Sequence, residues 1–224
     1  MSRAIILQHV EFEGPGRIVP VFRDFGIPTE VRHLYRGDEV PTDLDELRVL
    51  VVLGGPMGVR DVGDAKYPFL AKEVELLQRM VAHDRAVLGV CLGAQLLAHA
   101  GGAKVYPNVK MGPPAGPGQP PKPVEPTEPL PEIGWAPVTF PFPGGTEPIV
   151  QGLHDGSMMF HFHFDTFDLP KLPAPANLAP PPAPPPPTGN ALISSTRLCR
   201  NEAFRFKTRL FGFQYHIELT PEGV

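Results

Sequence analysis

A cysteine framed by glycines constrains the fold of this chain more than any other feature. The segment Gly89-Val90-Cys91-Leu92-Gly93 ends a short apolar run, residues 86–91, of the kind typical of a buried parallel strand. Residues 92–102 have a helical composition and end in glycine. Glycines two positions before and after Cys91 would let strand and helix approach at a sharp turn that exposes the thiol. The pattern predicts an α/β fold and favours a nucleophile over a small buried core cysteine.

The first half of the chain alternates between strand-like and helix-like segments. Apolar runs at residues 4–10, 30–35 and 47–55 are separated by polar or helical stretches, which indicates parallel strands joined by crossovers. Residues 68–84 are expected to form one amphipathic helix, because apolar side chains recur there three or four residues apart. These side chains are Leu70, Val74, Leu77 and Val81.

The second half of the chain contains further strand-like segments. They cover residues 134–140, 158–164, 191–197, 202–206 and 209–216. Several lie close enough in sequence to form an antiparallel extension beside the parallel sheet. We therefore predict a central, mostly parallel sheet with flanking helices and a small antiparallel part.

Proline is unusually frequent, with 31 residues in 224 against a usual share of about 5%. Most of the excess lies at about residues 112–131 and 173–188, where proline excludes helix interiors and central strands. We interpret both segments as surface loops of a single domain, residues 1–224. A docking site for proline-recognising modules and an artefact of the sequence are the alternatives. Thr220-Pro221-Glu222 is typical of the first turn of a helix, which would then be cut off.

The composition excludes several classes of function. A net charge of −4 without a basic cluster gives no footprint for nucleic acid or for an anionic membrane surface. No apolar run approaches the length of a membrane span, and the N-terminus lacks the pattern of a signal peptide. We therefore expect a cytoplasmic protein. Two cysteines cannot form a disulfide framework, and Cys199, which has no glycine frame, is treated as incidental.

A thiolate nucleophile needs a histidine to carry a proton and a group to orient that histidine. His216 ends an apolar run and Glu218 follows two residues later, so both side chains would share one face if the strand continues. His161 and His163, with Asp165, could instead bind a metal or supply a rival base. Without a third ligand motif, a structural role near the site is the better interpretation, and no metal is predicted.

A glycine-rich turn, residues 54–58, directly follows the third apolar run. Glycines there let backbone N–H groups face a bound oxyanion. The segments GGPMG, GVCLGAQ and QYHIE, in this order, resemble the glutaminase domain of class I, triad-type glutamine amidotransferases. The segments EIGWAPV, HFHFDTFDLP and HIELTPE are most similar to stand-alone proteins related to the glutaminase domain of GMP synthase.

This resemblance implies a flavodoxin-like fold without a cofactor. It implies Cys91 as the nucleophile, His216 as general base and acid, and Glu218 as the orienting carboxylate. It also implies an oxyanion hole and a substrate pocket. These would use the backbone of Gly55 and Leu92 for the oxyanion, and Met57 and Gln95 for the substrate. Two positions depart from the family pattern: Phe164 replaces a small residue and Ile217 a proline.

Three functions follow from these observations. The first is a glutaminase that releases ammonia from glutamine, with a separate synthetase chain as the acceptor partner. The second is hydrolysis of γ-glutamyl peptides or other conjugates by the same residues. The third is a catalytically silent domain that binds a partner, which the intact Cys91, His216 and Glu218 disfavour. Leu92 after the nucleophile disfavours the peptidase branch of related folds, which has histidine there.

Overall fold

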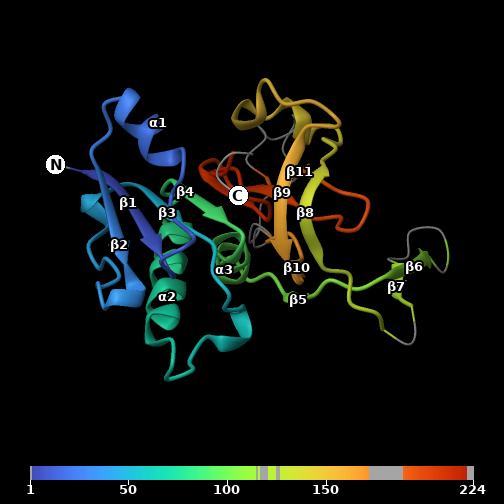
Figure 1. Ribbon diagram of the computed structural model, residues 1–224, viewed down its shortest axis with the longest axis horizontal. Coiled ribbons are helices and arrows are strands. Elements are labelled where there is room, and N and C mark those ends of the chain that lie inside the picture. The colour runs from blue at the N-terminus through green and yellow to red at the C-terminus, as the bar shows by residue number, and fades with distance from the viewer. Residues whose placement is uncertain (1, 115, 117–120, 125–126, 172–188, 221–224) are drawn as a thin grey trace, which may run out of the picture.

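A seven-stranded sheet with the order β11-β12-β13-β4-β3-β1-β2 forms the centre of the computed structural model (Figure 1). The structure describes residues 2–114, 116, 121–124, 127–171 and 189–220. Its parallel strands are β1 (Arg3–Gln8), β2 (Thr29–His33), β3 (Leu47–Val52), β4 (Val87–Val90) and β13 (Leu210–Phe213). All five coincide with predicted apolar runs, and the α/β fold class is confirmed.

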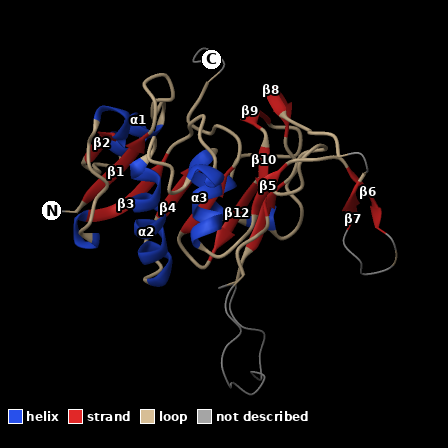
Figure 2. Ribbon diagram, turned by 90° about the horizontal axis from the view of Figure 1, so that it is seen from below, coloured by secondary structure: helices blue, strands red, loops and turns tan. Residues whose placement is uncertain are grey.

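Helices cover both faces of the sheet. Side chains alternate along β1, so Ile5 and Leu7 pack with α2 (Pro68–Ala82) and α3 (Leu92–Ala100) on one face. Ile6 packs on the opposite face against α1 (Ile18–Asp24). Figure 2 shows α2 and α3 side by side along the sheet. The expected amphipathic helix is therefore α2, and its buried side chains are Leu70, Glu73, Val74, Leu76, Leu77 and Met80.

Short 3-10 helices connect several elements. They are Leu34–Arg36, Leu44–Glu46, Val59–Asp61, Gly144–Thr146 and Pro148–Val150. The helix Val59–Asp61 follows the predicted glycine-rich turn. It therefore helps to place the segment between β3 and α2.

The antiparallel part of the fold divides into separate sheets. The strands β11 (Ala191–Ser194) and β12 (Ala203–Phe206) extend the main sheet next to β13. By contrast, β8 (Glu132–Pro137) pairs with β9 (Met158–His163), and β5 (Val105–Pro107) pairs with β10 (Asp165–Phe167). The prediction of strands was correct for β8, β9, β11 and β12, although they do not all join one extension, and β5 and β10 were not predicted. Buried side chains of Val138, Ile193, Phe213 and Tyr215 connect the β8–β9 pair to the main sheet.

The first proline-rich segment is not only a loop. Its strands β6 (Met111–Pro114) and β7 (Pro121–Pro123) pair antiparallel in a small sheet that projects from the rest of the chain (Figures 1 and 2). Proline is tolerated there because each strand lies at an edge. The segment at residues 173–188 and the expected helical turn at residues 221–222 lie outside the described residues. Among the described helices, none is both long and apolar enough to cross a membrane.

Candidate active site

Cys91 stands at the turn between β4 and α3. Its backbone has φ of 51° and ψ of −109°, a left-handed region that a residue with a Cβ rarely occupies. A Cβ on Gly89 would clash with the carbonyl of Gly93, and a Cβ on Gly93 would clash with the carbonyl of Val52. The two glycines are therefore required by close backbone approach, as predicted. The strained turn aims the Cys91 side chain away from the sheet.

The thiol of Cys91 is nearly buried and is surrounded by polar groups. It lies 3.7 Å from the carbonyl oxygen of Phe162, to which it can donate, and 3.8 Å from the amide Nε2 of Gln214. Cys91 also precedes the first turn of α3, whose free N–H groups and partial positive charge favour an anion.

His216 and Glu218 are brought together by a turn, so the predicted strand continuation is wrong. β13 ends at Phe213, the chain bends, and His216 forms only an isolated bridge with Phe160. Its Nδ1 nevertheless lies 2.6 Å from Oε1 of Glu218, and both side chains are buried. A hydrogen bond from Nδ1–H to the carboxylate fixes the ring and leaves Nε2 as the free nitrogen.

The electrostatic surroundings of His216 favour its protonated form. Burial by itself would lower the pKa of His216. Hydrogen bonding to Cys91 and to Glu218 outweighs burial and raises the pKa of His216 to about 10. The raised pKa keeps His216 in its imidazolium form at neutral pH, so it can give a proton to a leaving group.

Gly54 marks the point where three ionisable side chains converge. A Cβ there would clash with Oε2 of Glu13 and would lie 3.1 Å from Cε1 of His216 and 3.4 Å from Cβ of Cys91. Burial raises the pKa of Glu13, although the nearby imidazoles of His216 and His9 act in the opposite direction. Glu13 was not predicted as part of the site, because no motif surrounds it in the sequence.

The glycine-rich turn beside Cys91 is held by a buried pair that the sequence did not reveal. His9 Nδ1 donates to the carbonyl of Gly54 at 2.9 Å, and His9 Nε2 lies 3.1 Å from both carboxylate oxygens of Glu73. Both side chains are fully buried. The next residue is Gly55, and neither its amide nor that of Leu92 donates a hydrogen bond to a described residue. Both N–H groups are therefore free to bind an anion.

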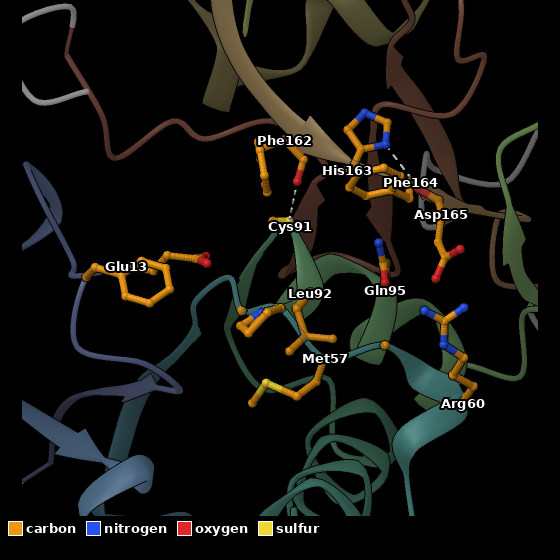
Figure 3. Close-up of a pocket in the computed structure, with 14 residues that line it drawn as sticks. Glu13, Met57, Arg60, Cys91, Leu92, Gln95, Phe162, His163, Phe164 and Asp165 are labelled. Atoms are coloured by element: carbon orange, nitrogen blue, oxygen red, sulfur yellow. Dashed lines mark hydrogen bonds between the residues drawn. The ribbon is translucent and has the colours of Figure 1, made fainter. Parts of the chain in front are cut away.

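A cavity of about 380 Å³ opens beside Cys91 (Figure 3). The predicted site residues that line it are Gly55, Met57, Cys91, Leu92 and Gln95. The amide of buried Gln95 donates to Oε1 of Gln214 at 3.3 Å. His216 faces instead a second depression that Trp135 also lines.

Charged and aromatic side chains complete the lining. Arg60 and Asp165 lie together at one end of the cavity, and Glu13 lies at the other (Figure 3). Phe162 and Phe164 are about half exposed, at 52% and 54%, and their rings meet edge to face. Phe164 and Asp165, to which the sequence assigned no role, therefore belong to the cavity. Arg60 carried no signal beyond its place after the glycine-rich turn.

Comparison with known proteins decides the family. The family profile described as glutamine amidotransferase class-I matches residues 16–175. The chain belongs to this family. The glutamine amidotransferase-like protein YfeJ of Salmonella typhimurium is 27% identical over 99% of this chain and 78% of its own length.

Solved structures agree with this family. A glutamine amidotransferase from Thermotoga maritima is 26% identical, with a TM-score of 0.74 over 99% of this chain and 78% of that one. A GMP synthase-like protein from Thermoplasma acidophilum shares the fold, with 24% identity and a TM-score of 0.60 over 100% of this chain and 89% of that one. The predicted class-I glutamine amidotransferase family and its flavodoxin-like fold are confirmed.

Three other positions singled out in the sequence of this class-I glutamine amidotransferase chain are buried. His161 and His163 are both buried on β9, and His163 also lines the cavity, which confirms that they pack near the site. Cys199 is buried beside Thr166, whose hydroxyl lies 3.2 Å from its sulfur. Burial, and after it the carboxylate of Glu202, raise the pKa of the Cys199 thiol. A thiol kept neutral in this way is a poor nucleophile.

Proposed function

We propose that this chain is a glutaminase that hydrolyses the γ-amide of glutamine through a thioester on Cys91. The observation that carries the proposal is the arrangement of the strained Cys91 turn with the buried His216–Glu218 pair. Membership of the class-I glutamine amidotransferase family supports the same reaction. The assignments of Cys91 as nucleophile, His216 as acid and base, and Glu218 as orienting group are part of this proposal.

The proposed reaction has two halves. The Cys91 thiolate attacks the γ-carbonyl carbon, and the backbone N–H groups of Gly55 and Leu92 stabilise the resulting oxyanion. Imidazolium His216 gives its proton to the amide nitrogen, the C–N bond breaks, and ammonia leaves. Water then attacks the thioester carbon and loses a proton to His216. Glutamate is released, and the thiolate–imidazolium pair is restored.

The charged end of the cavity fits the other end of the substrate. Glutamine carries an α-carboxylate and an α-ammonium group, and Arg60 and Asp165 offer the two opposite charges. Met57 and Gln95 also line the cavity and are the proposed contacts of the side-chain methylenes and amide. The ammonia would pass to an acceptor site on a separate synthetase chain.

A second candidate function is hydrolysis of γ-glutamyl peptides or other γ-glutamyl conjugates. Phe162 and Phe164 favour it, because their half-exposed rings offer an apolar surface at the cavity for a group attached to the γ-nitrogen. The bond broken and the proposed roles of Cys91 and His216 stay the same. Only the leaving amine differs.

Steady-state hydrolysis of glutamine and of a panel of γ-glutamyl dipeptides tests the proposal. Wild-type protein is compared with Cys91→Ala and with Cys199→Ala, a matched control for loss of a buried thiol. If the chain is a glutaminase, kcat/KM is higher for glutamine than for every dipeptide. Activity is then lost in Cys91→Ala and kept in Cys199→Ala. Higher kcat/KM for a dipeptide would replace the glutaminase with the conjugate hydrolase. No turnover of any compound would favour the catalytically silent domain.

A further inference from the structure

Four acidic and imidazole side chains form a closed cluster behind the wall of the cavity. Glu132 begins β8, His161 and His163 lie on β9, and Glu202 directly precedes β12. One ligand atom from each of the four lies within 4.8 Å of those of the other three, and all four residues are buried. The sequence showed only the two histidines, because the carboxylates come from distant segments.

Six polar atoms of this cluster make no hydrogen bond to the described residues. They are both ring nitrogens of His161, both carboxylate oxygens of Glu202, Nε2 of His163 and Oε2 of Glu132. His161 and Glu202 are completely buried, at 0% exposure. Leaving so many buried polar atoms unpaired is costly, so native structures rarely do it. Because one ligand atom from each residue lies close to those of the other three, a single group that accepts electron pairs would satisfy one atom of each residue.

The spacing of these atoms fits a metal ion. Nδ1 of His161 lies 3.3 Å from Oε2 of Glu202, and Nε2 of His163 lies 3.3 Å from Oε2 of Glu132 and 3.4 Å from Oε1 of Glu202. None of these approaches has hydrogen-bond geometry. Ligands about 2.0–2.1 Å from a tetrahedral ion stand about 3.3–3.4 Å from one another. The three observed separations have this length, with Glu202 presenting a different oxygen to each histidine.

The surrounding contacts orient the ligands as metal sites require. Nδ1–H of His163 donates to the carbonyl of Asp165 at 3.1 Å, which leaves the lone pair of Nε2 pointing into the cluster. The hydroxyl of Thr196 donates to Oε1 of Glu132 at 2.7 Å and so turns Oε2 inward. Two glutamates also supply the two negative charges that balance a divalent cation beside neutral imidazoles.

We propose that Glu132, His161, His163 and Glu202 bind one divalent first-row transition metal ion such as Zn²⁺. Mixed imidazole and carboxylate ligands in a tetrahedral arrangement suit this class of ion and not Ca²⁺ or Mg²⁺, which prefer oxygen ligands. The ion joins β8 and β9 to β12 and so supports the cavity wall. Phe162, between the two histidines, provides the carbonyl that faces the Cys91 thiol.

Metal content and Co²⁺ binding of the full chain test the proposal. Wild-type protein is stripped by a chelator, titrated with Co²⁺ or Zn²⁺, and examined by elemental mass spectrometry and visible absorption. Cys91→Ser is titrated in parallel because it removes the Cys91 thiol, which together with His216 is the alternative place for a metal. We expect one equivalent of metal per chain in both proteins, tetrahedral Co²⁺ bands, and a Tm raised by about 5 °C.

Ligand variants assign the site. His161→Gln and Glu202→Gln should weaken Co²⁺ binding at least about tenfold, while the exposed-residue controls His154→Gln and Glu75→Gln should bind as wild type. Circular dichroism shows which variants fold, and only folded variants are compared. If neither ligand variant folds, the titrations of wild type and Cys91→Ser decide alone.

Three results would overturn the site. The first is that folded wild-type protein takes up less than about 0.1 equivalent of metal from a tenfold excess of Co²⁺ or of Zn²⁺. This result would show that the cluster is a metal-free ionic network. Binding could persist unchanged in folded His161→Gln and Glu202→Gln. Binding could also disappear in Cys91→Ser, which would place the metal at the thiol. None of these readouts depends on hydrolysis, so they are independent of the proposed glutaminase.

Discussion

Nδ1 of His216 lies 2.6 Å from Oε1 of Glu218, although the chain between them turns and does not continue the strand. In an extended strand, residues two apart point the same way but stand about 6.6 Å apart along the chain. The turn shortens this separation to that of a charge-assisted hydrogen bond. The bridge from the amide of His216 to the carbonyl of Phe160 holds the turn in place.

Replacing Glu218 by glutamine should lower kcat/KM for glutamine by about 10²-fold or more. The amide preserves the volume but removes the charge that stabilises imidazolium His216 and selects its orientation. Glu75→Gln, an exposed change of the same chemistry, is the matched control and should keep wild-type activity. Equal activity of Glu218→Gln and wild type would remove Glu218 from the site.

The pH profile of hydrolysis should reflect the raised pKa of His216. Ammonia departure needs imidazolium His216, which is present below its pKa of about 10 and is lost above it. We therefore expect kcat/KM to fall as the pH rises through about 10. In Glu218→Gln the pKa of His216 decreases, because one of the groups that raise it is gone, so the fall should begin at lower pH. An alkaline limb that does not move in this variant would contradict the assignment.

Replacing Gly93 by alanine should destabilise the fold by about 3 kcal/mol or more, because the new Cβ meets the backbone carbonyl of Val52 and neither can move freely. Urea unfolding monitored by circular dichroism measures the change. Gly189→Ala is the control, since no atom of the described residues lies within 4 Å of a Cβ placed on Gly189, and the variant should lose less than about 0.5 kcal/mol. Similar losses at the two positions would mean that the turn at Cys91 is not closely packed.

The buried His9–Glu73 pair predicts a pH-dependent stability. Burial lowers the pKa of His9, but the charge and hydrogen bond of Glu73 outweigh it, so the folded pKa is raised above 6.5. The resulting stability is fully present below about pH 6.5 and is lost as the pH rises through the folded pKa. Glu73→Gln should therefore cost about 3 kcal/mol below pH 6.5 and less at alkaline pH.

Urea unfolding of wild type and Glu73→Gln across this pH range measures the difference between them. Subtracting the two curves cancels the contributions of the other histidines. A difference that stays constant with pH would show that His9 does not take up a proton on folding.

Local patterns in the sequence predicted the parallel half of the fold and the turn at Cys91. The strands β1, β3 and β4 coincide with apolar runs, and the glycines around Cys91 allow the close backbone contacts at its turn. Both predictions depend only on the pattern of residues within one short segment, and the structure agrees with them.

Side chains that meet through tertiary contacts could not be predicted in the same way. Glu73 lies on the apolar face of α2, where a sequence pattern gives no reason for a charge, and its partner His9 is 64 residues away. Glu132 and Glu202 meet His161 and His163 only because two sheets pack together. The turn at His216 was also missed, since the apolar run of β13 continues in sequence after its hydrogen bonds end.

Intact-protein mass spectrometry after incubation with a chloroketone or diazoketone analogue of glutamine tests the central claim most directly. Wild type, Cys91→Ala and Cys199→Ala are treated in parallel. If Cys91 is the nucleophile, one adduct forms on wild type and on Cys199→Ala, and none on Cys91→Ala. Absence of an adduct on wild type, or an adduct that persists in Cys91→Ala and disappears in Cys199→Ala, would contradict the assignment of Cys91 as a γ-glutamyl-directed nucleophile.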